Sequence, residues 1–195
     1  DEISITGVRE FKKNQDGYEI RFNASNLIAS LFFSSKFSIN NDEVNSKTYD
    51  VKIRPKFLKK NQSVIFNQQK GFVESNGHTS WRFEFDNTGL LLDPLNVQIM
   101  IRTLIKKGLN SFELDIIDME NGGSKTYSYA VRKDETCIVD GTEYNCTILE
   151  RYRENNNRVV KYYLAKELDY MFVKIIDISP DKINRLELKE ILSFG

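Results

Sequence analysis

The chain is short of the residues that interrupt regular structure and of those that hold metals. It has three prolines, ten glycines, two cysteines and a single histidine in 195 residues. So little proline and glycine excludes a collagen-like or low-complexity chain. Two thiols with no histidine nearby cannot complete a tetrahedral zinc site. We therefore expect a globular protein with no metal and no other cofactor.

An excess of basic charge is also missing. Lysine and arginine together number 28, as do aspartate and glutamate, so the formal net charge is zero. A protein that binds nucleic acid normally carries basic residues in excess, because binding to phosphate releases counterions. Nucleic acid is therefore excluded as an expected partner.

No stretch of about 18 apolar residues is present, which is the length needed to span a bilayer as a helix. The chain begins at Asp1 without a methionine or a basic-then-apolar leader. An exported protein begins in this way after its signal peptide is removed, and so does any shortened chain. We expect no transmembrane segment, and the start of the chain permits export.

Aromatic residues, by contrast, are plentiful: thirteen Phe, nine Tyr and one Trp. Aromatic and β-branched side chains suit the pleated surface of a sheet, so this composition favours β-structure. No linker or internal repeat divides the chain. We expect one domain over residues 1–195, burying roughly 70% of its unfolded surface, and a monomer.

Alternating apolar and polar residues predict many strands with one buried face. The clearest runs are 18–24, 49–53, 81–85, 112–116, 127–129, 144–153, 158–165, 171–178 and 185–191. Less regular runs lie at 32–39, 63–66 and 72–74. Asn40-Asn41-Asp42 predicts a turn, because Asn and Asp tolerate positive φ.

One helix is predicted over about residues 94–107. Asp93 can cap its first turn, Pro94 suits the first helical position, and Gly108 suits the residue after its end. An apolar stripe follows helical spacing through Val97, Met100, Ile101, Leu104 and Ile105. A single helix with so broad an apolar face must be covered by sheet. The predicted fold is mainly β: a strongly curved antiparallel sheet, a half-barrel or open barrel, wrapped around one central helix.

The two cysteines lie a hairpin's width apart, at Cys137 and Cys146. If Gly141-Thr142 is the two-residue loop, the cysteines face each other at a non-hydrogen-bonded pair, where a disulfide can form. If Asp140-Gly141 is the loop, the register shifts and the cysteines should miss each other. They are then two small apolar residues in a strand pair. We favour the disulfide, which indicates folding outside the reducing cytosol.

No catalytic signature is evident. The lone histidine, His78, follows Asn76-Gly77 and is expected to be an exposed loop residue. Glu113 and Asp115 share one face of a predicted strand and alternate with apolar residues, which is typical of a solvated face. We therefore expect no catalytic residues and a protein that is not an enzyme.

Residues from about 90 to 192 resemble a bacterial family, domain of unknown function 3108. The matching segments are Leu91-Leu-Asp-Pro-Leu-Asn-Val-Gln, Tyr127-Ser-Tyr-Ala-Val-Arg-Lys-Asp-Glu, Gly141 with Cys146-Thr-Ile-Leu-Glu-Arg, and Tyr163-Leu-Ala-Lys-Glu-Leu-Asp-Tyr-Met-Phe-Val-Lys-Ile. The last is similar to a family pattern of Trp-Leu-Ala-Pro followed by Leu-x-Tyr-Leu-Pro-Val-Arg-Ile. Here Tyr163 takes the place of the Trp, and Lys166 and Phe172 take the places of the two prolines.

The resemblance implies an exported, periplasmic envelope protein of a Gram-negative bacterium. It also implies a curved antiparallel sheet similar to the half-barrels of lipoprotein carriers, and it supplies no catalytic residues.

Two functions fit these expectations. The first is a binding module that holds a lipid or another apolar ligand beside the helix. Its expected lining is Trp81, Phe83, Met100, Ile101 and Leu104, although for any one of these residues packing in the core is the favoured role. The second is an envelope assembly module that docks a protein partner through a sheet edge or a loop.

Overall fold

The computed structural model describes residues 5–26, 29–54, 60–85, 89–153 and 156–193. The chain divides into two compact units. The first comprises Asp1–Met100 and Asp115–Lys125, and the second comprises Ile101–Leu114 and Thr126–Gly195. That residues 1–195 form one domain stays a prediction.

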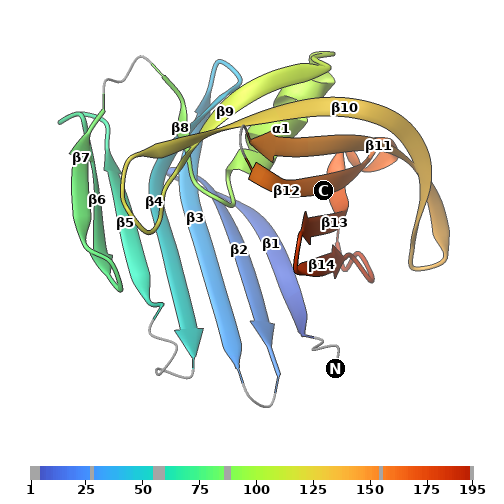
Figure 1. The fold of residues 1–195 in the computed structure, drawn as a ribbon, viewed down its shortest axis with the longest axis horizontal. Coiled ribbons are helices and arrows are strands. Elements are labelled where there is room, and N and C mark those ends of the chain that lie inside the picture. Colours follow the sequence, from blue (N-terminus) through green and yellow to red (C-terminus); the bar gives the residue numbers. More distant parts are fainter. Residues whose placement is uncertain (1–4, 27–28, 55–59, 86–88, 154–155, 194–195) are drawn as a thin grey trace. The chain divides into compact units, whose positions relative to one another are not determined.

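Seven strands of the first unit form an antiparallel meander, in which each strand pairs with the next along the chain (Figure 1). These strands are β1 (Thr6–Asn14), β2 (Gly17–Ser25), β3 (Ser30–Asn40), β4 (Glu43–Arg54), β5 (Gln62–Asn67), β6 (Phe72–Gly77) and β7 (Trp81–Glu84). Between β3 and β4, Asn41 and Asp42 have φ of 52° and 65°. Positive φ at both positions is what a two-residue type I′ turn requires, so the turn predicted here is confirmed.

A second seven-stranded sheet has the strand order β14-β13-β12-β11-β10-β9-β8. Its members are β8 (Leu91–Leu92), β9 (Ser111–Ile117), β10 (Ser124–Val139), β11 (Thr142–Arg153), β12 (Asn156–Ala165), β13 (Met171–Ser179) and β14 (Lys182–Glu187). The pairings from β10 to β14 are antiparallel, whereas β8 pairs with β9 in parallel. The sheet is therefore mixed.

The α-helix, α1, spans Val97–Lys106. At its start, the carboxylate of Asp93 accepts hydrogen bonds from the amides of Leu95 and Asn96, at 2.8 and 2.9 Å. At its end, Gly108 has a φ of 82°, which a glycine adopts without strain. Both predicted end signals are confirmed. In the described ranges no helix combines the length and the apolar character needed to cross a membrane.

The first unit has a compact apolar core contributed mainly by β4, β5 and β6. It consists of Tyr49, Val64, Phe66, Val73 and Ile117, each at most 6% exposed. Successive residues on one face of a strand are two apart, so the spacing of Val64 and Phe66 places both on the same face. This face is the buried side of the first sheet.

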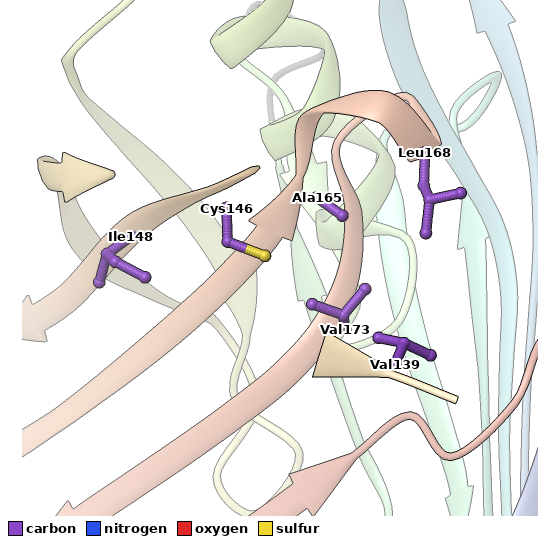
Figure 2. Packing of buried hydrophobic residues seen from close by; sticks show 6 residues of the cluster. All are labelled: Val139, Cys146, Ile148, Ala165, Leu168 and Val173. Atoms are coloured by element: carbon purple, nitrogen blue, oxygen red, sulfur yellow. The ribbon is translucent and has the colours of Figure 1, made fainter. Parts of the chain in front are cut away.

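The second unit has its own core at the hairpin of β10 and β11 and the neighbouring strands. Figure 2 shows its buried residues, which are Val139, Cys146, Ile148, Ala165, Leu168 and Val173. Leu168 lies in a short 3-10 turn, Lys166–Leu168, that joins β12 to β13. The next residue, Asp169, has a φ of 54° and binds Arg102 and Lys106 of α1, each at 2.8 Å.

The prediction of a mainly β fold with antiparallel pairing and one α-helix is confirmed. The prediction of a single sheet is wrong, because the strands form two sheets, and neither closes into a barrel among the described residues. Alternation identifies a strand and its buried face, but it does not identify the strand's partner. That a curved sheet wraps around α1 stays a prediction.

Candidate functional site

One face of the first sheet carries a group of neighbouring apolar side chains that are only partly buried. The strand register places Phe33 of β3 between Phe22 of β2 and Val51 of β4, and the rings of Phe22 and Phe33 lie 6.2 Å apart. Leu31 and Ile53 form the next cross-strand pair on the same face. We call these five half-buried residues the apolar strip.

Aromatic residues extend this face towards the edge strand. Phe11 of β1 stacks on Tyr18 of β2 with the ring centroids 5.5 Å apart, and Tyr18 lies 5.9 Å from Phe37 of β3. Phe37 is fully buried, whereas Phe11 is 51% exposed. The aromatic surface therefore runs from the core to solvent without a break. Single exposed apolar residues are ordinary in folded proteins, but contiguous apolar surface commonly marks a binding site.

A buried polar cluster lies on the same face. The Ser35 hydroxyl donates to the Asp93 carboxylate at 2.6 Å, and the Asn96 side-chain amide donates to the Ser46 hydroxyl at 2.8 Å. Ser46 in turn donates to the Leu91 carbonyl at 2.9 Å. Ser35, Ser46, Asp93 and Asn96 are each at most 2% exposed. Because these groups satisfy one another, the cluster fixes residues 91–96 to strands β3 and β4.

Burial raises the pKa of Asp93 to about 7, against the lowering effect of the hydrogen bonds from Ser35 and from the amides of Asn96 and Leu95. A carboxyl group with such a pKa would suit general acid–base chemistry. However, both of its oxygens already accept hydrogen bonds from the protein. The cluster is therefore best explained as a structural one.

Two small cavities lie near β4 and β5 in the first unit, with volumes of about 250 and 140 Å³. Both are lined by Ser46, Phe66 and Gln68. Pockets for drug-sized ligands usually exceed about 300 Å³, so each cavity suits only a small molecule. The apolar strip lines neither of them.

The structure brings two of the five predicted pocket residues together. Trp81 and Phe83 lie on β7 with their ring centroids 5.6 Å apart. The Trp81 indole N–H donates to the Met119 carbonyl at 3.2 Å. Its ring packs so closely on Gly122 that a Cβ there would lie 3.1 Å away. Trp81 therefore has a structural role in the first unit.

The other three predicted pocket residues lie on α1. Met100 and Ile101 are 3% and 1% exposed, and Leu104 is half-buried. Met100 belongs to the first unit, and Ile101 and Leu104 belong to the second. None of the five lines either cavity. That they line a ligand pocket stays a prediction.

The predicted disulfide between Cys137 and Cys146 is present, with the Cα atoms 5.9 Å apart. The register that was expected to allow it is wrong. Val139 pairs with Thr142, so Asp140-Gly141 is the two-residue loop and Cys137 faces Tyr144. The cysteines are diagonal neighbours on one face of the hairpin. Strand twist brings one diagonal of each four-residue square closer, here within the Cα separation of about 4.4–6.8 Å that disulfides span.

Two of the residues considered for catalysis, His78 and Glu113, are exposed. His78 is exposed in the loop after β6, where its backbone amide donates to the Asn61 carbonyl at 2.8 Å. Glu113 is exposed on β9 and accepts a hydrogen bond from Ser128 at 3.0 Å. Within the described part of the chain, no three His, Cys, Asp or Glu residues gather where they could hold a metal ion.

The apolar strip was not predicted as a site, although the sequence pattern predicts strands that contain some of its residues. Alternation predicts strands over 18–24 and 49–53, which contain Phe22 and Val51. The pattern of β3 is obscured, because Phe32 points away from the strip and Ser34 and Ser35 are both buried on opposite faces. Only the observed register places Phe22, Phe33 and Val51 side by side.

No family model matches the chain, and no curated protein matches it. Among solved structures it is similar to a beta-barrel-like protein of a domain of unknown function, DUF1849, from Brucella abortus. The TM-score is 0.59 and the sequence identity 10%, and the match covers 95% of this chain and 87% of that one. At this identity the likeness shows the fold alone. The similar protein is a domain of unknown function, which agrees with the prediction of an uncharacterised family. Membership of domain of unknown function 3108 stays a prediction.

Proposed function

We propose that this protein is a non-enzymatic binding module for a lipid or another apolar ligand, and that the apolar strip is the surface that contacts it. The observation that carries the proposal is the continuity of the strip. Phe22, Phe33 and Val51 are direct cross-strand neighbours, and all three are only half-buried.

The energetics of burial support this proposal. Each methylene group of a ligand that leaves water contributes about 0.8 kcal/mol, so a short alkyl chain laid along the strip gains several kcal/mol. The strip is also held in place. Ser35 follows Phe33 by two residues on β3 and is tied to Asp93 by its hydrogen bond. A surface held rigid before binding loses less conformational entropy when the ligand binds.

The proposal includes an exported, periplasmic location, and the disulfide between Cys137 and Cys146 supports it. Disulfides form and persist in oxidising compartments and are rare in the cytosol. A half-barrel around α1 is part of the same proposal. It is supported by the likeness to a beta-barrel-like protein, and a structure of the protein with bound ligand would test it.

Binding is tested with protein from which bound lipid has been removed. A fluorescent fatty-acid probe is titrated, and its dissociation constant is compared between the protein and its Phe33→Asp and Phe33→Ala variants. We expect Phe33→Asp to weaken binding by more than about tenfold, because it places a charge on the surface that the alkyl chain contacts. Phe33→Ala gives a smaller loss and covers the case in which the aspartate variant does not fold.

The matched control is Phe32→Ala. Phe32 is the preceding residue on β3, is also half-buried, and lies on the opposite face, where Lys52 approaches its ring at 5.4 Å. The control should bind the probe as tightly as the unmodified protein. Equal affinity for the Phe33 variants and the control would contradict the proposal. Mass spectrometry of the natively purified protein should also detect a co-extracted lipid.

A second candidate function, a protein-interaction module, is favoured by one observation. Every residue of β14, the last strand in the order of the second sheet, is exposed, and Ile183 and Leu186 are 58% and 48% exposed. Edge strands with free backbone groups can pair with a strand of a partner. Crosslinking from position 183 in cells would test this, and the absence of any defined crosslinked partner would contradict it.

A further inference from the structure

The aromatic cluster of the second unit has a polar end that lacks a hydrogen-bond partner. Phe112, Tyr129, Tyr162 and Phe172 pack in series, with ring centroids 5.3, 6.4 and 5.2 Å apart. Tyr129 is 1% exposed, and its buried hydroxyl has no well-formed hydrogen bond among the described groups. The side chain that interacts with it is Arg151, which can donate to the hydroxyl oxygen but cannot accept its proton. Buried polar groups are nearly always hydrogen-bonded, so an exception of this kind points to a missing partner.

An arginine lies directly opposite this tyrosine. Arg151 of β11 pairs with Tyr129 of β10, so the two side chains share one face of the sheet. The Arg151 guanidinium stacks over the Tyr127 ring, with its Cζ 4.6 Å from the centroid. Arg151 is half-buried, and no carboxylate in the described part of the chain forms an ion pair with it. Its guanidinium interacts with the Tyr129 hydroxyl and with the charge of Asp177, and its five N–H donors leave further ones for a ligand.

The surroundings are positively charged. Arg158 donates to the carboxylate of Asp177 at 2.7 Å. That hydrogen bond lowers the pKa of Asp177, and the charges of Arg158, Arg151 and Lys182 lower it further. Three cations thus lie around one carboxylate, and the excess positive charge attracts anions.

We propose that Arg151 and Tyr129 form a binding site for a small oxyanion, a carboxylate or a phosphate group, on the face of the second sheet that β10 and β11 share. The planar guanidinium donates two parallel hydrogen bonds to such a group, which suits both anions. The Tyr129 hydroxyl donates a third hydrogen bond and thereby gains its missing partner. The site needs no metal and no second protein chain.

We infer that the anion reaches the hydroxyl when the Arg151 side chain, which interacts with it, moves. Arg151 is half-buried, and partly exposed side chains change rotamer on the picosecond-to-nanosecond timescale. The backbone of β10 and β11 is held by its ladder of hydrogen bonds and stays in place. The Arg151 side chain therefore reorients towards the anion, and the sheet is unchanged.

The test is isothermal titration calorimetry of the full chain at constant ionic strength, in a buffer free of phosphate and carboxylate. The probes are inorganic phosphate, acetate and octanoate. We expect saturable binding of at least one of them, weakened at least about tenfold by Tyr129→Phe and by Arg151→Lys. Octanoate binding far tighter than acetate identifies the ligand as the carboxylate of an alkyl chain, whereas tightest binding of phosphate identifies a phosphate group.

Two further measurements make the test decisive. Tyr129→Phe removes a hydroxyl without a partner, so in the absence of anion it should leave the melting temperature unchanged or raise it. The controls are Tyr152→Phe and Arg185→Lys, whose side chains lie on the opposite face of the sheet, and they should bind as the unmodified protein does. Absence of saturable binding, or affinity unaffected by both Tyr129→Phe and Arg151→Lys, overturns the proposal.

Discussion

The two units stabilise their interiors in different ways. The first unit buries the carboxyl group of Asp93, and both of its oxygens accept hydrogen bonds, from Ser35 and from two backbone amides. The second unit buries Tyr129 with its hydroxyl unsatisfied and is held by a covalent bond between Cys137 and Cys146. The comparison shows that strands with similar alternation can bury a polar network in which every group is hydrogen-bonded, or an incomplete network in which one group is not. The incomplete network is where the anionic group is proposed to bind.

The largest effect is expected in the core of the first unit. Phe37→Ala removes a fully buried ring and should lower the free energy of unfolding by about 4 kcal/mol. Phe11→Ala, at the exposed end of the same aromatic stack, should cost about 1 kcal/mol or less because Phe11 is already half in solvent. Urea denaturation measures both. Similar losses in the free energy of unfolding for the two variants would show that the buried ring of Phe37 does not contribute more to stability than the exposed ring of Phe11.

The next effect is a pH dependence confined to the first unit. Burial raises the pKa of Asp93 from 3.8 to about 7, so the folded protein holds this proton more tightly than the unfolded chain. The stabilisation is complete below about pH 4 and is lost as the pH rises through 7. Its size is at most about 4 kcal/mol, from about 1.4 kcal/mol per pKa unit.

The measurement for Asp93 is urea denaturation from pH 4 to pH 8. Asp93→Asn, which does not titrate, should lose this component of the pH dependence, whereas Asp181→Asn, in an exposed turn, should keep it. A pH profile that is the same in both variants would show that Asp93 titrates normally.

A smaller effect is expected in the second unit. Reduction of the disulfide, or replacement of both cysteines by alanine, should lower the free energy of unfolding by about 2.5 kcal/mol, because the closed loop is short. Hydrogen exchange should then lose protection at β10 and β11 but not at β1 to β7. Equal loss of protection in both units would show that they unfold together. The two units would then not be stabilised independently.

The smallest effect is expected at the surface ion pairs. Arg132 and Glu150 are joined at 2.6 Å across β10 and β11, and the Arg132 side chain is 50% exposed. Arg132→Ala should cost about 0.5 kcal/mol, and less in high salt, because solvent screens exposed charges. A cost above that of losing the disulfide would mean that surface charge, and not the covalent bond, holds the hairpin.

Much of the fold could be predicted because local patterns encode it. The strand over 18–24 appears as β2, and Asp93 and Gly108 lie at the expected ends of the helix. β1 was missed because, of its residues on the covered face, only Phe11 is a large apolar one. Edge strands carry charged residues such as Lys12 and Lys13 and lose the alternating pattern.

The candidate sites could not be predicted, because they depend on pairing between distant segments. Tyr129 and Arg151 are neighbours only in the observed register of β10 and β11, which contains a β-bulge between Val131 and Lys133. A shift by one residue would place them on opposite faces. The same limit explains why the cysteine bridge was expected in the wrong register.

The diagonal placement of the disulfide has a consequence for the shape of the hairpin. In the square of residues formed by positions 135, 137, 144 and 146, the bond joins Cys137 to Cys146, and Glu135 and Tyr144 occupy the other diagonal. A flat ribbon would make the two diagonals alike, so the bond locks in the coiling that makes one shorter. Strongly coiled ribbons are poor templates for adding strands from other molecules. The bridge therefore fixes the twist of the β10–β11 hairpin as well as adding to its stability.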